Sequence, residues 1–273
     1  MLPSHIVVKL GGEVVASAHM RALARSIATL RSRGQGVVVV HGGGPQASDL
    51  QRKLGQTPRI VAGRRITDSE TLEVMKMAVA GKVNVDACAA LLEAGARPIG
   101  LHGASSLVVE ASKRPPRVVS GGGPGAIDFG HVGDVTAVNR ELLMLLSNAG
   151  YVPVIACLAA DAQGHVFNIN ADAVANRLAV ELNARALVIV SEVSGVLRDV
   201  SDPTTRIPRL TLAEGRKVVA EGVVTGGMIP KLEESFAALA GGVAAVHIVG
   251  SARAGDLGVE MAAPGSVGTV LVP

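Results

Sequence analysis

The chain has 273 residues, enough for one large α/β domain or two closely joined lobes. Hydrophobic residues make up 48% of it, but there is no Trp, one Tyr and three Phe, so the core must consist of Val, Leu, Ile and Ala. This composition argues against base stacking on nucleic acid, and the net charge of +3, carried by scattered Lys and Arg, argues against a nucleic-acid-binding patch.

Membrane, targeting and metal signals are missing from the sequence. No apolar run approaches membrane-spanning length and no signal-peptide pattern precedes the first strand, so we expect a soluble cytoplasmic protein without a membrane partner. Neither the two cysteines, Cys88 and Cys157, nor the seven histidines are spaced as metal ligands. We therefore expect no metal ion held by protein side chains alone.

A βαβ unit with two glycine turns opens the chain. The sequence predicts a strand over His5–Leu10, a helix over about 18–33 and a buried strand over Val37–Val40. The strands end in Gly11-Gly12 and in Gly42-Gly43-Gly44. Because parallel strands place their carboxyl ends at one edge of the sheet, both turns should face the same crevice.

The second glycine turn is a candidate anion site. Glycine N–H groups can approach a ligand closely, and the helix that begins near Gln46 adds the positive end of its dipole. An anion cradle and an ordinary glycine-rich βα turn fit this stretch about equally well. It is not a P-loop, because no Gly-Lys-Ser/Thr follows, and it lacks the ribose-binding acid of a dinucleotide site.

The remaining elements follow in chain order. We expect a hairpin flap over 59–67, a long helix from about Ser69 to Ala94 with methionines in core or subunit contacts, and a strand over 97–101. Residues 102–134 are irregular, and Gly121-Gly122-Gly123-Pro124 is expected to be a loop or hairpin lid rather than a second phosphate cradle. After a division near Ala149, we expect strands over 151–157, 186–190, 244–249 and 267–271, a hairpin over 159–168, and helices over 138–149, 172–182, 211–221, 231–240 and 256–261.

Two lysines beside glycines suggest phosphoryl chemistry. Lys9 precedes Gly11-Gly12, and Lys231 follows Gly226-Gly227. Each lysine alone is most simply a solvated side chain at the end of an element. Together, on opposite sides of a transferring phosphoryl group, they would stabilise its transition state, with Asp172 holding them in place. Asp172 could equally be a helix N-cap.

Five short motifs stand in a fixed order along essentially the whole chain. They are Val8-Lys9-Leu10-Gly11-Gly12, His41-Gly42-Gly43-Gly44-Pro45, Gly63-Arg64-Arg65-Ile66-Thr67-Asp68, Asn168-Ile169-Asn170-Ala171-Asp172 and Gly227-Met228-Ile229-Pro230-Lys231. In this order they resemble the amino acid kinase family. The first two are shared with aspartokinases, carbamate kinases and glutamate 5-kinases, whereas the third and fourth are similar to the acetylglutamate kinase branch.

The resemblance implies a fold and a reaction. The fold is α/β, a three-layer αβα sandwich with an open, mainly parallel central sheet, in one domain of residues 1–273 with an acceptor-binding and dimerisation lobe (1–149) and an ATP-binding lobe (150–273). The reaction is ATP-dependent phosphorylation of the γ-carboxylate of N-acetyl-L-glutamate to N-acetyl-L-glutamyl 5-phosphate, the second step of arginine biosynthesis. Mg²⁺ would arrive with ATP, and no catalytic base is needed because a carboxylate is ionised at neutral pH.

The resemblance also implies roles for individual residues. Lys9 and Lys231 would stabilise the transferring phosphoryl group, with Asp172 orienting both lysines. Arg65 would bind the α-carboxylate of the substrate with help from Asn168. Gly11, Gly12 and Gly43 would touch phosphates through their N–H groups, and Gly43 with Gly44 would line the acceptor. The adenine and ribose would be bordered by two segments, 191–197 and 223–225, with Glu192, Ser194, Gly195, Val196, Leu197, Val223, Val224 and Thr225.

Three segments depart from the family pattern outside the expected catalytic set. Val83-Asn84-Val85-Asp86 stands where Asn-Lys is common, the loop from Gly103 to Pro116 lacks a Ser-Gly-Lys-Asp-Gly-like run, and Glu192 stands where Asp is usual. Arginine-sensitive members of the family have an N-terminal helix that joins dimers into hexamers, and because the first strand is predicted from about His5, we expect that helix to be missing. We therefore expect an arginine-insensitive homodimer built on the helix near 69–94.

Other functions remain open on the sequence alone. A kinase for another acyl acceptor, such as carrier-linked aminoadipate, gains slight support from the basic residues Lys113, Arg114 and Arg117 in the expected lid. A non-catalytic metabolite-sensing binder of the same fold is the alternative from another class, and the intact catalytic set argues against it. A dinucleotide-dependent oxidoreductase is weaker because the ribose-binding acid is missing.

Overall fold

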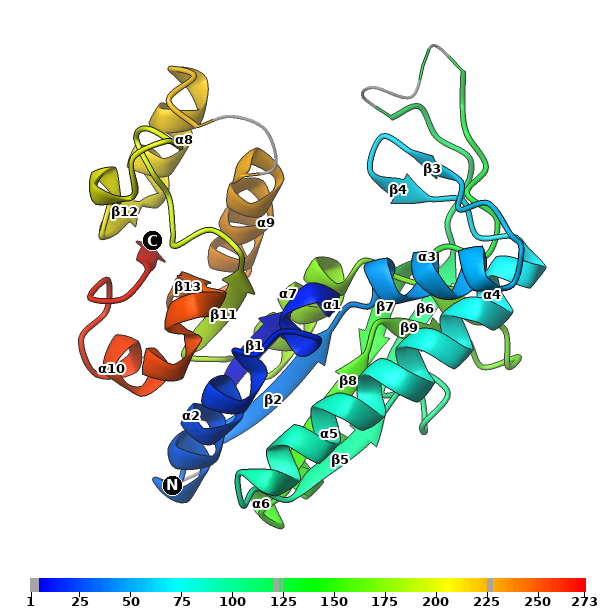
Figure 1. The fold of residues 1–273 in the computed structure, drawn as a ribbon, viewed down its shortest axis with the longest axis horizontal. Helices are drawn as coiled ribbons and strands as arrows, with labels where there is room; N and C mark the ends of the chain where they lie inside the picture. Colours follow the sequence, from blue (N-terminus) through cyan, green and yellow to red (C-terminus); the bar gives the residue numbers. More distant parts are fainter. Residues whose placement is uncertain (1–4, 120–122, 124, 225–227) are drawn as a thin grey trace.

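A long central sheet runs through the molecule (Figure 1). The computed structural model describes residues 5–119, 123, 125–224 and 228–273. Within them, eight strands form one sheet in the order β12-β14-β13-β11-β1-β2-β8-β5, parallel throughout except for the pair β13 and β14. These strands are β1 (His5–Leu10), β2 (Gly36–His41), β5 (Pro98–Leu101), β8 (Val152–Ala156), β11 (Ala186–Ser191), β12 (Arg209–Thr211), β13 (Val246–Gly250) and β14 (Thr269–Val272).

Helices cover both faces of this sheet, which confirms the expected three-layer sandwich. Side chains alternate along β1, so that Val7 packs in the core on one face while Ile6 and Val8 pack on the other. The first face is covered by α6 (Arg140–Asn148), α7 (Ala171–Glu181), α8 (Leu212–Ala220) and α9 (Met228–Ala240). The second is covered by α2 (Met20–Ser32), α5 (Asn84–Glu93), the 3₁₀ turn η3 (Ser251–Asp256) and α10 (Leu257–Ala262). A further 3₁₀ turn, η2 (Pro203–Thr205), buries none of its residues.

The two glycine turns each lead straight into a helix. α1 (Gly12–Val15) follows β1, and α3 (Gly44–Lys53) follows β2. Because β1 and β2 are parallel neighbours, both helices begin at the same edge of the sheet, as the sequence predicted.

The long helix expected over 69–94 is one continuous helical segment with a π-helical centre. It consists of α4 (Ser69–Met75), the π-helical stretch η1 (Lys76–Val83) and α5. Asp68 caps it by accepting a hydrogen bond from the N–H of Thr71 at 2.9 Å. The 3.6-residue periodicity of an α-helix cannot reveal a π-stretch, because π-turns close from residue i to i+5.

A second, four-stranded sheet and a small hairpin lie beside the central sheet. The sheet has the order β10-β9-β6-β7, with β6 (Val109–Lys113), β7 (Gly133–Val138), β9 (Leu158–Ala160) and β10 (Val166–Asn168). The hairpin consists of β3 (Ile60–Val61) and β4 (Arg64–Arg65). The hairpins expected over 59–67 and 159–168 are thus confirmed.

Two expectations for this region were wrong in part. Residues 102–134, expected to be the least regular part of the chain, contain the unforeseen strand β6 and the start of β7. The helix expected from Val138 begins at Arg140, because Val138 ends β7. Pro115-Pro116 and the glycines beyond them hid the short alternating pattern of β6. Most of the predicted lid motif lies outside the described residues, which include only Gly123 of Gly121–Pro124. The lobe boundary near Ala149 stays a prediction, and β8, which follows it, pairs with β2 and β5.

Candidate active site

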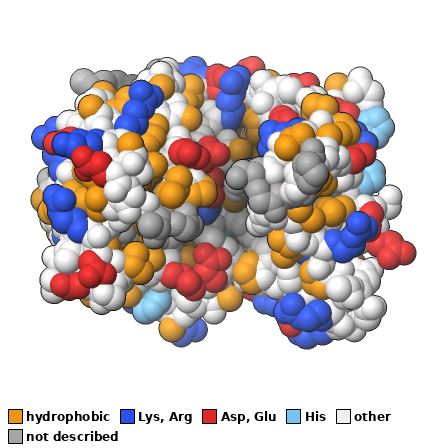
Figure 2. All heavy atoms as spheres, turned by 90° about the horizontal axis from the view of Figure 1, so that it is seen from above, with side chains coloured by type: hydrophobic (Ala, Val, Ile, Leu, Met, Phe, Trp, Pro, Cys, Tyr) orange, Lys and Arg blue, Asp and Glu red, His pale blue; other side chains and the backbone are white. Residues whose placement is uncertain are grey.

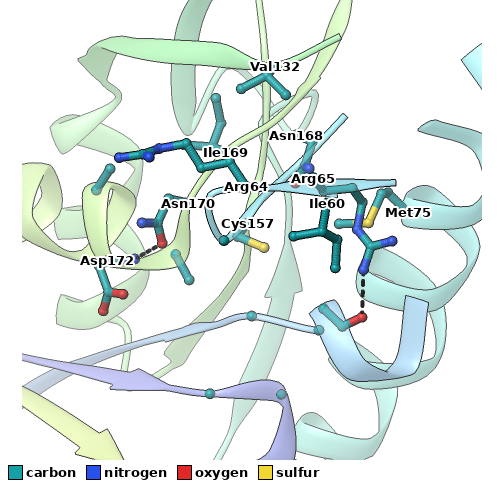
Figure 3. Close-up of a pocket in the computed structure, with 18 of the residues that line it drawn as sticks. Ile60, Arg64, Arg65, Met75, Val132, Cys157, Asn168, Ile169, Asn170 and Asp172 are labelled. Atoms are coloured by element: carbon teal, nitrogen blue, oxygen red, sulfur yellow. Dashed lines mark hydrogen bonds between the residues drawn. The ribbon is translucent and has the colours of Figure 1, made fainter. Parts of the chain in front are cut away.

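A cavity of about 700 Å³ lies at the carboxyl ends of β1 and β2. It brings together side chains from distant parts of the chain, and Figure 3 shows Arg65, Asn168 and Asp172 around it. Seen from above, this face of the molecule has a hollow between its two sides, with acidic and basic side chains interspersed around it (Figure 2). The predicted residues that line the cavity are Lys9, Gly11, Gly12, Gly43, Gly44, Arg65, Asn168 and Asp172.

The two glycine turns touch one another at the floor of this cavity. A Cβ atom added to Gly12 would lie 2.8 Å from the Cα of Gly43, and one added to Gly43 would lie 2.9 Å from Cγ2 of Val79. Gly12 and Gly44 are the first residues of α1 and α3, so their N–H groups have no partner inside the helix. Within the described part of the chain, the N–H groups of Gly12, Gly43 and Gly44 have no hydrogen-bond acceptor, so they remain available to an anion.

Lys9 and Asp172 form an ion pair across the cavity. Lys9 Nζ lies 2.9 Å from Asp172 Oδ1, and the two side chains are only 11% and 22% exposed. Lys9 projects from a central strand, while Asp172 lies in the first turn of α7, which Asn170 caps by accepting a hydrogen bond from the N–H of Asp172 at 3.0 Å. Rigid elements therefore hold both charges, and water is largely kept from them.

Arg65 is anchored on α3 beside the second glycine turn. Its guanidinium donates to Gln51 Oε1 at 2.5 Å, to Ser48 Oγ at 2.6 Å and to the carbonyl of Gly44 at 3.0 Å. These bonds engage three of its five N–H groups and fix the orientation of the fork. Burial lowers the pKa of Arg65 from its usual 12.5. Asn168 donates to Thr67 Oγ1 at 3.0 Å, so the hairpin flap and β10 meet at this wall.

The described residues expected to border the adenine and ribose lie outside the cavity lining, unlike Gly11 and Gly12, which were expected to bind the phosphates. Ser194 and Gly195 follow β11, which neighbours β1 and ends at the same edge of the sheet. The side chains of Val196 and Val224 are 0% and 4% exposed and belong to the core, and the N–H of Val196 is bonded to Thr269 Oγ1 at 2.8 Å. Glu192 is exposed, Leu197 and Val223 are partly buried, and Thr225 lies outside the described residues.

Lys231 does not line the cavity either, although its helix reaches it. Lys231 lies near the start of α9, and Glu234, one turn further on, lines the cavity. Figure 1 places α9 and the β3–β4 hairpin on opposite sides above β1 and β2. The structure thus brings Lys9 and Asp172 together. The placement of Lys231 beside them stays a prediction.

The cavity lining also includes residues that the sequence analysis did not single out as site residues, among them Met75, Cys157 and Glu234. Burial raises the pKa of the Cys157 thiol to about 12, so it is a neutral group. Burial and the charge of Asp172 raise the pKa of Glu234, whose Oε2 accepts a hydrogen bond from Asn176 at 2.5 Å. Cys157 follows the buried strand β8 directly, so the rule that ligands lie at carboxyl ends of strands could have found it.

The basic residues of the expected lid are partly neutralised. Arg114 and Arg117 line the cavity, as Arg64 does. Arg114 Nη2 lies 2.6 Å from Asp134 Oδ1, and Lys113 Nζ lies 3.8 Å from Asp128 Oδ2. The lid is therefore not the strongly basic surface that an acidic carrier protein would require.

The described residues form neither a side-chain metal site nor a membrane-spanning helix. In this part of the chain, no group of three or more His, Cys, Asp or Glu side chains is arranged to hold a metal ion. None of its helices combines the length and the apolar character needed to cross a membrane.

Comparison with known proteins assigns the family. A profile of the amino acid kinase family matches residues 4–250. The chain is 60% identical to the acetylglutamate kinase of Sorangium cellulosum (strain So ce56) over 268 residues, 98% of this chain and 94% of the relative. It is 54% identical to the acetylglutamate kinase of Anaeromyxobacter dehalogenans (strain 2CP-1 / ATCC BAA-258) over 267 residues, 98% of each chain. The chain belongs to the acetylglutamate kinases. It is therefore a kinase, as the sequence predicted.

Solved structures agree with the fold expected of an acetylglutamate kinase. The smu.665 protein from Streptococcus mutans UA159 has a TM-score of 0.78 and 26% identity, with 98% of each chain covered. N-acetylglutamate synthase from Neisseria gonorrhoeae has a TM-score of 0.83 and 24% identity, and the match covers 100% of this chain and 60% of the synthase. The second likeness shows the fold alone. The alternatives of a carrier-linked acceptor, a non-catalytic binder or an oxidoreductase are not favoured, because full-length relatives above 50% identity are named acetylglutamate kinase.

Proposed function

We propose that the protein transfers the γ-phosphoryl group of ATP to the γ-carboxylate of N-acetyl-L-glutamate, forming N-acetyl-L-glutamyl 5-phosphate and ADP in arginine biosynthesis. The observation that carries the proposal is the Lys9–Asp172 pair beside two touching glycine turns, in a chain 60% identical to an acetylglutamate kinase. Because ATP is supplied inside the cell, the proposal places the enzyme in the cytoplasm.

The proposed chemistry depends on positioning and charge rather than on a base. The acceptor carboxylate is already ionised at neutral pH, so nothing has to remove a proton from the nucleophile. Lys9 places a positive charge where the oxygens of the transferring phosphoryl group gain negative charge, and Asp172 holds the lysine in that position. The N–H groups of Gly11, Gly12 and Gly43 bind phosphate oxygens, and Lys231 approaches from α9 on the other side.

The acceptor is bound at the opposite wall of the cavity. Arg65, already oriented by α3, presents its remaining N–H groups to the α-carboxylate, and Asn168 binds beside it. Gly43 and Gly44 lie between this wall and Lys9, so the γ-carboxylate lies against the glycine turn. This arrangement suits a dicarboxylate whose α-carboxylate is bound by Arg65 and whose γ-carboxylate reacts beside Lys9.

The nucleotide would lie over the carboxyl ends of β1 and β11. Its adenine and ribose would contact the segments 192–197 and 223–225, with Val196 and Val224 supporting these segments from the core. Mg²⁺ bound to the phosphates supplies counter-charge to the triphosphate. The absence of a side-chain metal cage among the described residues fits an ion that is coordinated mainly by phosphate and water.

We also propose that the enzyme is a homodimer built on the segment α4–η1–α5. Met77, Val85 and Leu92, three large apolar side chains on one helical segment, are 52%, 62% and 61% exposed. The neighbouring strand β5 forms an edge of the central sheet. A second copy packed on this helix would cover these side chains and protect the strand edge.

An ATP-turnover assay with different acceptors tests the function. N-acetylglutamate should stimulate ATP use far more than glutamate, aspartate or N-acetylaminoadipate, since full-length relatives at 54% and 60% identity are named acetylglutamate kinase. If N-acetylaminoadipate were the preferred acceptor, the acceptor class would have to be revised. If no acceptor stimulated ATP use, the chain would be a binder rather than an enzyme.

A further inference from the structure

His41 is a fully buried histidine at the end of β2, directly before the second glycine turn. Its ring makes two hydrogen bonds. Nδ1 lies 2.8 Å from the carbonyl oxygen of Gly42, and Nε2 lies 2.9 Å from Nδ2 of Asn84. His41 does not line the cavity, so it cannot touch a substrate. The proposed reaction gives it no role.

The surrounding network fixes which ring nitrogen carries the proton. Nδ2 of Asn84 also lies 3.0 Å from the carbonyl oxygen of Val154, which can only accept a hydrogen bond. Asn84 therefore donates both protons of this nitrogen, one to Val154 and one to His41 Nε2. Because Nε2 accepts, the neutral ring carries its proton on Nδ1 and donates it to the Gly42 carbonyl. Burial lowers the pKa of His41 more than the bond to Gly42 raises it, which keeps the ring neutral.

This hydrogen bond determines the direction of the next N–H group. The peptide bonds of the described chain are all trans, so the Gly43 N–H points opposite to the Gly42 carbonyl and away from the His41 ring. Gly12 lies close to this nitrogen, since a Cβ added to it would be 3.0 Å from the Gly43 nitrogen, and both Gly12 and Gly43 line the cavity, whereas His41 does not. Holding the Gly42 carbonyl in the core thus directs the Gly43 N–H to the cavity.

The same helical segment supports the turn at a second point. Val79 in η1 contacts Gly43 so closely that an added Cβ would lie 2.9 Å from Val79 Cγ2. Asn84 comes five residues later, at the start of α5. In a π-helix residues five apart are one hydrogen-bonded turn apart. The π-helical stretch therefore places Val79 and Asn84 on the same side of the helical segment, next to Gly43 and His41.

We propose that His41 is a positioning residue, which holds the Gly42–Gly43 peptide so that the Gly43 N–H faces the phosphoryl group in transfer, and that Asn84 selects the ring tautomer this requires. The proposal rests on the phosphotransfer function proposed above. A donor fixed before the reaction begins stabilises the transition state without having to reorient. Without the bond from His41, the Gly42–Gly43 peptide could rotate and the donor would be lost for part of the time.

Two substitutions separate the two hydrogen bonds of His41. In His41→Asn the side-chain N–H group takes the place of ring Nδ1 and can donate to Gly42, but it does not reach Asn84. In His41→Gln the amide oxygen takes the place of ring Nε2 and can accept from Asn84, but no donor faces Gly42. Both variants leave a polar amide in a buried site, so both should lower the melting temperature to a similar degree.

Steady-state kinetics of the full-length enzyme with N-acetylglutamate and MgATP should distinguish the variants. We expect kcat of His41→Gln to fall by about 10- to 100-fold, with KM values changed much less, because the donor acts mainly in the transition state. His41→Asn should retain kcat within about fivefold. The exposed His19→Gln is the matched control and should behave as the wild type.

Equal losses of kcat in His41→Gln and His41→Asn would overturn the proposal. Both variants are expected to lose similar stability, so equal losses would be explained by the loss of stability without any role for the bond to Gly42. If neither variant folds, nitrogen-15 NMR of wild-type enzyme labelled at histidine decides instead. A neutral ring with its proton on Nδ1, unchanged over about pH 6 to 8, supports the role, whereas an Nε2–H or titrating ring overturns it. A wild-type enzyme that phosphorylates no acceptor overturns the proposed function and this role with it, whereas an active wild type with equal losses overturns this role alone.

Discussion

Nδ1 of His247 lies 2.7 Å from Oε1 of Glu260, and both side chains are almost completely buried. Glu260 also accepts hydrogen bonds from the N–H groups of Gly265 at 2.7 Å, Val267 at 2.8 Å and Gly268 at 3.1 Å. One carboxylate therefore holds the loop that leads into β14. The next residue, Thr269, bonds the N–H of Val196 in the proposed nucleotide segment, so this buried acid supports the nucleotide half of the site.

We expect Glu260 to make stability depend on acid pH. Burial raises its pKa, but the hydrogen bonds from His247, Gly265, Val267 and Gly268 outweigh burial and bring the pKa from 4.5 to about 2. Because the pKa of Glu260 is lower in the folded than in the unfolded chain, the ionised carboxylate stabilises the fold. This contribution is complete above pH 4.5 and is lost as the pH falls toward 2. Glu260→Gln should cost about 3 kcal/mol near neutral pH and flatten this acid dependence.

Urea unfolding of both proteins at a series of pH values would measure this effect. Glu221→Gln, at an exposed helix end, is the control and should leave the curve unchanged. An unaltered acid dependence in Glu260→Gln would mean that another carboxyl group is responsible.

Lys9→Met should separate catalysis from stability. The substitution removes the charge next to Asp172 but keeps an unbranched side chain on β1, so unfolding should become easier by only about 1 to 2 kcal/mol. Turnover should fall by about 1,000-fold, because the charge that faces the phosphoryl group is lost. Lys53→Met is the control, because Lys53 forms a similar ion pair with Asp49 on the exposed surface. It should leave kcat and the melting temperature unchanged. Losses of stability and turnover in proportion would make Lys9 a structural residue.

Gly43→Ala should impair the enzyme through a steric contact that can be relieved. The new methyl group would lie 2.9 Å from Cγ2 of Val79 and push the glycine turn away from the helix. We expect kcat to fall by at least about tenfold, and Val79→Ala in the same chain to restore part of it. Gly258→Ala, away from the cavity, is the matched control, because its Cβ would meet nothing within 4 Å. Failure of the double variant to recover would argue against this contact as the cause.

Val85→Glu together with Leu92→Glu should yield a monomer. The two residues lie seven positions apart on α5, on one face of the helix, and charges there would oppose contact with a second copy. Size-exclusion chromatography with light scattering should show a dimer for the wild type and a monomer for the variant. The exposed Leu145→Glu on α6 is the control, and a wild-type monomer or hexamer would contradict the proposed assembly.

The sequence predicted those parts of the fold and site that depend on local patterns. The run Val37–Val40, followed by His41 and three glycines, placed β2 and the second glycine turn correctly, and parallel pairing of β1 with β2 brought both glycine turns to one edge of the sheet. Lys9 and Asp172 line the same cavity there. The tautomer of His41 could not be predicted, because it depends on Asn84 and Val154, which are distant in the chain. The same holds for Glu234, since only tertiary packing brings it to the cavity wall. Cys157 differs, because its place directly after β8 was a usable signal.

The strand that carries Lys9 has neighbours from opposite halves of the chain. β1 pairs with β2, where Lys9 lies opposite Val40, and with β11, where it lies opposite Ile189. During synthesis, β2 follows β1 closely, but the second edge of β1 stays unpaired until residues 186–191 have been made. Such long-range pairing folds slowly and leaves an open strand edge for that time. The reaction centre therefore cannot form in either half alone, and its assembly depends on the slowest pairing in the sheet.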